Sequence, residues 1–316
     1  MRRVFIALCL LVTVAGCAQK SGLAPREGFL EVPGGKVWYR ITGSGTKTPL
    51  LLLHGGPGVP SYYLNPLAKL ADERPVIFYD QLGCGRSDRP ADSTLWTIDH
   101  FVSELAEVRK QLGLTKVHLL GHSWGTILAA EYLRTNPTGV ESAILASPAN
   151  SIPRWIVDAD SLLMTMPDST QAIIAANELA GTTQSPEYQG AMMEFYHLYV
   201  ARAPWGPDID STFAGMGQSV YVSMCGPSEF TITGSLKTYE GSEVLKQIHT
   251  PTLFTIGEYD EVPLATAQYY QSLVPGSKLE VIEGAAHLSM QDAPDRYVAV
   301  IRKFLSEVEG TASTSH

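Results

Sequence analysis

The sequence predicts an α/β protein in which a mostly parallel central sheet carries helices on both faces and a helical cap is inserted between strands. Short aliphatic runs recur along the chain and alternate with segments whose apolar residues have helical spacing. This alternation is typical of buried parallel strands joined by crossover helices. It stops between residues 150 and 250, where Trp, Met, Tyr and Pro are frequent, and this change predicts the cap.

The individual strands and helices follow from local patterns. The segment from Glu31 to Ile41 alternates around Pro33-Gly34-Gly35 and predicts a hairpin. Continuous apolar runs predict six further strands, at Pro49–Leu53, Val76–Tyr79, Val117–Leu120, Ser142–Leu145, Thr252–Ile256 and Leu279–Ile282. Helical spacing occurs at Phe101–Leu112, Thr126–Arg134 and Arg296–Val308. The expected domains are a core of residues 29–149 and 251–310, a cap of residues 150–250 and a disordered tail of residues 311–316.

The N-terminus has the layout of an export signal. Two arginines precede an apolar stretch at residues 4–14, which is too short for a bilayer-spanning helix of about 20 residues. The ending Val-Ala-Gly-Cys resembles a bacterial lipoprotein signal, so we expect a signal peptide of residues 1–17 with Cys17 as the lipidated residue. Residues 18–28 are predicted to be a tether. Ala18 suggests, by the same resemblance, retention at the outer membrane; the alternative is an ordinary cleaved signal and a free periplasmic protein.

Composition and residue spacing argue against nucleic acid binding, a disulfide framework and a metal site. The chain has 23 Lys and Arg against 32 Asp and Glu, and no basic run follows Arg3, which argues against nucleic acid as a partner. Cys9 and Cys17 belong to the signal, and we expect Cys84 and Cys225 to be free thiols. No group of His, Cys and Asp has metal-ligand spacing, so neither a metal nor an organic cofactor is expected.

The strongest chemical signal is Gly121-His122-Ser123-Trp124-Gly125. It fits the G-x-S-x-G pattern and lies between a predicted buried strand and a predicted helix, which is the context that this motif requires. The glycines leave room for a strained turn that presents the serine. Ser123 is therefore the candidate nucleophile.

A serine nucleophile needs a base, and the base needs an acid to orient it. Asp260 follows the predicted strand that ends at Ile256, and His287 follows the strand that ends at Ile282. Both loops lie at the sheet edge that carries Ser123, in the order Ser, Asp, His, so these residues are the candidate triad. The other histidines lack this placement and are interpreted as structural or surface residues: His54, His100, His118, His122, His197 and His249.

Acyl transfer also needs two N–H donors for the oxyanion of the tetrahedral intermediate. One candidate is the backbone N–H of Trp124, which follows the nucleophile. The other is expected in the loop His54-Gly55-Gly56-Pro57-Gly58, after the strand that ends at Leu53, and Gly56 is our candidate there.

Four motifs together resemble one family. They are HGGPG at residues 54–58, DQLGCGRS at 80–87, GHSWG at 121–125 and GPSEFTITGSL at 226–236. They look like the prolyl iminopeptidases and the tricorn interacting factor F1 aminopeptidases, which are serine peptidases of the α/β-hydrolase fold. The resemblance spans nearly the whole mature chain. It implies removal of an N-terminal residue, preferentially proline, from short peptides through an acyl-enzyme.

The resemblance also implies how the substrate amine is held. Glu229, in the GPSEF stretch of the cap, and Glu261, directly after Asp260, match the two carboxylates that bind the α-ammonium in relatives. Charge-assisted hydrogen bonds of this kind contribute about 1.5–3 kcal/mol each. Asp80 and Gln81 are expected to brace the oxyanion loop and not to contact substrate.

Other readings of the same residues stay open at this stage. An amidase acting on amino-acid amides such as prolinamide would use the same triad and the same carboxylates. An esterase has no use for Glu229 and Glu261, and an epoxide hydrolase or dehalogenase would carry Asp in place of Ser123. From a different class, a binding lipoprotein on a non-catalytic scaffold would be expected to have lost a triad residue. The expected partners are a small peptide or amide substrate and, through the N-terminal lipid alone, a membrane.

Overall fold

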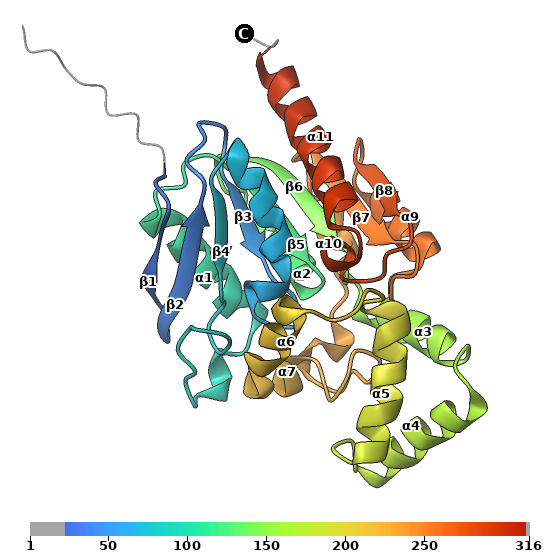
Figure 1. Cartoon of the computed structure of the whole chain (residues 1–316). Helices are drawn as coiled ribbons and strands as arrows, with labels where there is room; N and C mark the ends of the chain where they lie inside the picture. The colour runs from blue at the N-terminus through green and yellow to red at the C-terminus, as the bar shows by residue number, and fades with distance from the viewer. Residues whose placement is uncertain (1–22, 314–316) are drawn as a thin grey trace, which may run out of the picture.

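A computed structural model describes residues 23–313 and contains an eight-stranded sheet between two layers of helices (Figure 1). The strand order is β1-β2-β4-β3-β5-β6-β7-β8, in which β2 is antiparallel to both of its neighbours and all other pairs are parallel. The strands are β1 (Arg26–Val32), β2 (Gly35–Thr42), β3 (Leu50–Leu53), β4 (Val76–Tyr79), β5 (Val117–His122), β6 (Val140–Ala146), β7 (Thr252–Gly257) and β8 (Lys278–Ile282). The predicted fold class is confirmed.

Helices cover both faces of this sheet. One layer contains α1 (Ile98–Gln111), α2 (Trp124–Arg134) and α9 (Leu264–Leu273). The other contains the 3-10 segment η1 (Ser61–Asp72), α10 (Ser289–Asp292) and α11 (Pro294–Ser313), which is seen in front of the sheet in Figure 1. A further 3-10 turn, η2 (Ser93–Leu95), precedes α1.

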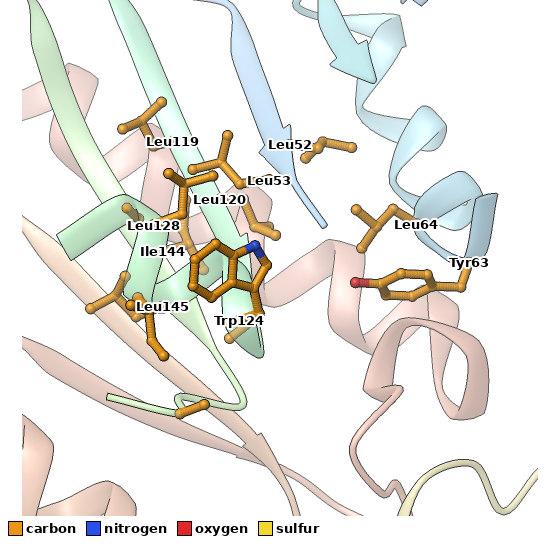
Figure 2. Close-up of a cluster of buried hydrophobic side chains, with 14 of the residues drawn as sticks. Leu52, Leu53, Tyr63, Leu64, Leu119, Leu120, Trp124, Leu128, Ile144 and Leu145 are labelled. Atoms are coloured by element: carbon orange, nitrogen blue, oxygen red, sulfur yellow. The ribbon is translucent and has the colours of Figure 1, made fainter. Parts of the chain in front are cut away.

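The core lies around the central strands, because these are buried on both faces. Every residue of β3, β4 and β5 is buried. Figure 2 shows side chains of β3, β5 and β6 packed with Trp124 and Leu128 of α2. The residue that follows Ser123 is thus part of the core, which holds the start of α2 rigidly against the sheet.

The insertion between β6 and β7 is helical. It contains α3 (Ile152–Leu163), α4 (Asp168–Ala180), α5 (Pro186–Tyr199), α6 (Pro207–Ala214), α7 (Gln218–Met224), η3 (Ser235–Thr238) and α8 (Ser242–Leu245). These elements occupy the segment that the sequence analysis assigns to the cap. In Figure 1 they lie below the sheet, with α4 and α5 extending furthest from it.

Both ends of the described chain are more regular than the sequence patterns predict. Arg26, Glu27 and Gly28 belong to β1 and pair with Tyr39–Ile41, so their assignment to a tether is wrong. Backbone pairing needs no apolar side chain, which is why the pattern missed it. Helix α11 likewise continues through residues 311–313, which had been expected to form a disordered tail. The predicted signal peptide of residues 1–17, with Cys17, lies outside the described residues.

Two further findings concern the cysteines and the search for membrane-spanning helices. Cys84 and Cys225 are both buried and free, as expected. Within residues 23–313, every helix is too short or too polar to cross a bilayer.

Candidate active site

Ser123 lies at a sharp turn between β5 and α2. Its backbone has φ 54° and ψ −122°, which is a strained conformation for a residue with a side chain. A Cβ atom on Gly121 would lie 2.1 Å from the Gly125 carbonyl oxygen, and one on Gly125 would lie 2.2 Å from the Leu53 carbonyl oxygen. Only glycine fits at both positions, so the motif is required by the close approach of these three segments.

Asp260 and His287 meet at the carboxyl ends of β7 and β8. His287 Nδ1 lies 2.8 Å from Asp260 Oδ1. Burial alone would raise the pKa of Asp260, but the adjacent His287 and the hydrogen bonds from His287, Ser147 and Val262 hold that pKa below its usual value. The ionised Asp260 therefore accepts the Nδ1 proton of His287 and leaves Nε2 available as the base. Ser123 and His287 line the same cavity.

Ser147 is a supporting residue that the sequence analysis missed. It follows β6 directly, has φ 48°, and is buried. Its Oγ lies 2.7 Å from Asp260 Oδ2 and 3.0 Å from the His287 carbonyl oxygen. Ser147 thus holds both members of the pair in place. Its position just after a buried strand, at the edge that carries the triad, is the signal that could have found it.

His122 connects the nucleophile to two other loops. The Gly55 N–H donates to the Tyr63 hydroxyl at 2.7 Å, and that hydroxyl lies 2.9 Å from His122 Nδ1. His122 Nε2 lies 2.9 Å from the His287 carbonyl oxygen. Burial and the neighbouring His287 lower the pKa of His122 to about 3, so the ring is neutral: its Nε2–H donates to His287 and its Nδ1 accepts from Tyr63. This histidine is structural, and it joins the oxyanion loop to the loop of the base.

The two candidate oxyanion donors face the same site. Gly56 and Trp124 both line the cavity that lies behind Ser123. Among the hydrogen bonds of residues 23–313, none is donated by the backbone N–H of either residue. The Gln81 side chain connects their loops, because its Oε1 accepts from the Trp124 indole at 2.9 Å and its Nε2 donates to the His54 carbonyl at 3.1 Å. Gln81 therefore acts as a brace and does not line either cavity at the site.

The two candidate amine-binding carboxylates differ in their surroundings. Glu261 is 2% exposed, and neither of its carboxylate oxygens has a hydrogen-bond partner among the described residues. Burial, together with the nearby carboxylates of Glu229 and Asp260, raises the pKa of Glu261 well above its usual value. Burial also raises the pKa of Glu229, against the opposing effects of His287 and a 2.8 Å hydrogen bond from Tyr221. A buried, unpaired carboxylate is costly and is satisfied by a cation.

The backbone of Glu229 is held by aromatic side chains of the cap. The Trp155 indole donates to the Glu229 carbonyl at 2.7 Å, and the Glu229 N–H donates to the Tyr196 hydroxyl at 3.2 Å. The side chain of Trp155 also packs edge-on against His287, with 5.6 Å between ring centroids. The cap thus fixes the backbone of Glu229, a residue that lines the same cavity as Ser123 and His287.

Two cavities meet at the nucleophile. One encloses about 540 Å³ and one about 320 Å³ of space that is partly open to solvent, and both are lined by Gly56, Ser123 and Glu229. His287 lines only the larger one. The smaller one is closed mainly by apolar groups: Trp124, Ile152, Trp155, Cys225, Ile232 and Leu236. The site therefore offers two compartments that share Ser123 and differ in most of their other lining residues.

Comparison with known proteins agrees with this geometry. Residues 48–294 match the family model described as alpha/beta hydrolase fold. The chain is 45% identical over 285 residues to a proline iminopeptidase of Heyndrickxia coagulans, covering 89% of this chain and 99% of the relative. It is 38% identical to a proline iminopeptidase of Saccharolobus solfataricus, covering 89% of this chain and 93% of the relative.

Solved structures give the same picture. The structure of proline iminopeptidase from Mycobacterium smegmatis aligns with a TM-score of 0.84 and 32% identity, covering 91% of this chain and all of that one. The structure of VinJ aligns with a TM-score of 0.87 and 33% identity, covering 90% of this chain and all of that one.

Proposed function

Because this chain belongs to the proline iminopeptidase family of the α/β hydrolases, we propose that it is a serine aminopeptidase that releases N-terminal proline from short peptides. The observation that carries the proposal is a pair of buried carboxylates beside the candidate triad. Glu229 lines both cavities at Ser123, and Glu261, whose oxygens have no hydrogen-bond partner in residues 23–313, has its Oε2 3.8 Å from His287 Nδ1. A free α-ammonium supplies the missing cation. An esterase substrate brings no such charge.

The mechanism follows from the hydrogen bonds at the site. His287, oriented by Asp260, takes the proton of Ser123 Oγ as that oxygen attacks the carbonyl carbon of the first residue. The oxyanion is stabilised by the N–H groups of Gly56 and Trp124. His287 then gives the proton to the leaving amine, which departs and leaves the acyl-enzyme. A water molecule repeats the two proton transfers and releases the free amino acid.

The linings of the two cavities support a proline-cleaving peptidase. Apart from Ser123, Cys225 and Glu229, the smaller cavity is lined by apolar groups, which suit the ring of proline. The larger cavity beside His287 provides a second space for a peptide leaving group. An amidase releasing ammonia would not need that second space.

We expect wild-type enzyme to hydrolyse proline anilide faster than the alanine and leucine anilides, and to have no measurable activity on N-acetylproline anilide. Acetylation removes the positive charge that Glu229 and Glu261 would bind and leaves a buried carboxylate unpaired. The measurement is initial anilide release by each compound at equal concentration. Equal rates for the free and the acetylated compound would mean that no amine is recognised.

We further propose that the chain is exported and anchored to a bacterial membrane through a lipid on Cys17. The arginines, short apolar stretch and Val-Ala-Gly-Cys ending support this proposal. In cells fed labelled palmitate, wild-type protein should carry label in the membrane fraction, and Cys17→Ser should not. Unlabelled wild-type protein would support the ordinary cleaved signal instead.

A further inference from the structure

The larger cavity lies on the side of the site from which the leaving group departs. His287 must pass its proton to the leaving amine, so that amine has to be next to the His287 ring. Of the two cavities at Ser123, only the 540 Å³ cavity is lined by His287. The first residue of the substrate therefore occupies the smaller cavity, and whatever follows the scissile bond occupies the larger one.

The larger cavity is apolar away from the triad. Beyond the catalytic groups its apolar walls are formed by Val59, Val200, Ile209, Phe213, Met216 and Leu288, and its uncharged polar residues include Thr212, Tyr63, Tyr196 and Tyr221. No lysine or arginine lines it, and its one carboxylate is Glu229, which in the proposed function is occupied by the substrate amine. A charged side chain that entered this space would lose its water and gain no partner.

We propose that this cavity is a subsite for the second residue of the peptide and that it selects apolar side chains at that position. The inference rests on the proposed function and adds its substrate class: short peptides that begin with proline followed by an aliphatic or aromatic residue. Helix α6 supplies the selective surface. Ile209 is buried, whereas Phe213 is 40% exposed at the cavity mouth and stacks on Trp205 with 5.0 Å between ring centroids.

The first test uses wild-type enzyme and dipeptide amides, which avoid a free C-terminal carboxylate. We expect kcat/KM for Pro-Phe-amide and Pro-Leu-amide to exceed that for Pro-Asp-amide and Pro-Lys-amide by about 10- to 100-fold. Equal values for the four dipeptides would overturn the inference. Proline anilide is measured alongside to distinguish failure of the proposed aminopeptidase function from failure of the subsite. If proline anilide is not cleaved, the proposed function is wrong. If it is cleaved but the four dipeptides react equally, only the subsite is wrong.

A positive charge introduced at Phe213 tests whether the second side chain of the substrate binds in the larger cavity. In Phe213→Lys we expect the ratio of kcat/KM for Pro-Phe-amide to that for Pro-Asp-amide to fall at least about 10-fold, because the new ammonium pairs with aspartate. The ratio comes from one enzyme sample, so it does not depend on how much of the variant folds. The matched control is Phe29→Lys, an exposed aromatic residue of β1 that lines neither cavity, whose ratio should equal that of wild type. An unchanged ratio in Phe213→Lys would place the second side chain elsewhere.

Discussion

Replacing Ser123 by alanine should lower kcat for proline anilide by about 10⁶-fold, to a residual rate that comes only from binding and the oxyanion donors. The reason is that Ser123 supplies the hydroxyl that attacks the substrate carbonyl. Ser123 lines both cavities, and its strained backbone points the side chain to their junction. The measurement is single-turnover anilide release at enzyme concentrations high enough to detect slow cleavage.

The control for this experiment is the fold of the variant. Alanine keeps the Cβ of serine and removes one hydroxyl, so the thermal unfolding temperature of Ser123→Ala should stay close to that of wild type. A decrease in kcat of less than about 10-fold, with the unfolding temperature preserved, would assign the nucleophile to another residue.

Replacing Glu261 by glutamine should lower kcat/KM for proline anilide by about 100-fold, mainly through KM. This corresponds to the upper part of the 1.5–3 kcal/mol that one charge-assisted hydrogen bond contributes. Glutamine keeps the size of the side chain but cannot carry the negative charge that an ammonium needs. The exposed Glu243, paired only with Lys246 on α8, provides the matched control variant Glu243→Gln, which should behave as wild type.

Wild type and Glu261→Gln should differ in the pH dependence of KM. Because burial and two neighbouring carboxylates raise the pKa of Glu261, the free enzyme holds a proton there at pH values where an ordinary glutamate is ionised. A protonated carboxyl binds an ammonium weakly, so KM of wild type should rise as pH falls through that raised pKa. In Glu261→Gln this rise should be shallower. Parallel profiles from about pH 5 to 7.5, where the substrate amine is largely protonated, would show that Glu261 does not bind the amine.

Much of the fold could be predicted because buried parallel strands leave a strong pattern. The runs that became β3 and β4 are aliphatic or aromatic throughout, and the run that became β5 is interrupted only by His118, since both faces of these strands are covered. The edge strand β1 could not be predicted to its first residue. Arg26, Glu27 and Gly28 pair through their backbone and leave no apolar signal.

The candidate triad could be predicted because its residues lie in loops that follow predicted strands, in the chain order Ser, Asp, His. Of the candidate triad, Ser123 directly follows the buried strand β5, and Asp260 and His287 lie in the loops after β7 and β8, where the structure places His287 Nδ1 2.8 Å from Asp260 Oδ1. The sequence does not indicate that Ser147 holds Asp260 and His287 in place, or that the neutral His122 joins the oxyanion loop to the His287 loop. Each acts through a hydrogen bond to a carbonyl or carboxylate far away in sequence, and no local pattern reports such a contact.

The two candidate amine-binding carboxylates could be predicted only from the family resemblance. A surface glutamate and a buried one look alike in a sequence, and only the resemblance pointed to Glu229 and Glu261. The structure adds that Glu261 is buried without a hydrogen-bond partner among the described residues, 3.8 Å from His287 Nδ1, and that Glu229 is held by Tyr221 and Trp155. Those contacts depend on how the cap folds over the sheet.

The order of elements along the chain has a consequence for biosynthesis. Ser123 lies before the cap insertion, whereas Asp260 and His287 lie after it, on loops that follow β7 and β8. Strand β7 pairs with β6, and β8 pairs with β7, so the acid and the base reach the serine only after these last two strands have joined the sheet. A growing polypeptide is made from its N-terminus, so it carries a nucleophile without a base throughout most of its synthesis. The candidate triad therefore cannot be assembled before β7 and β8 have been synthesised and paired.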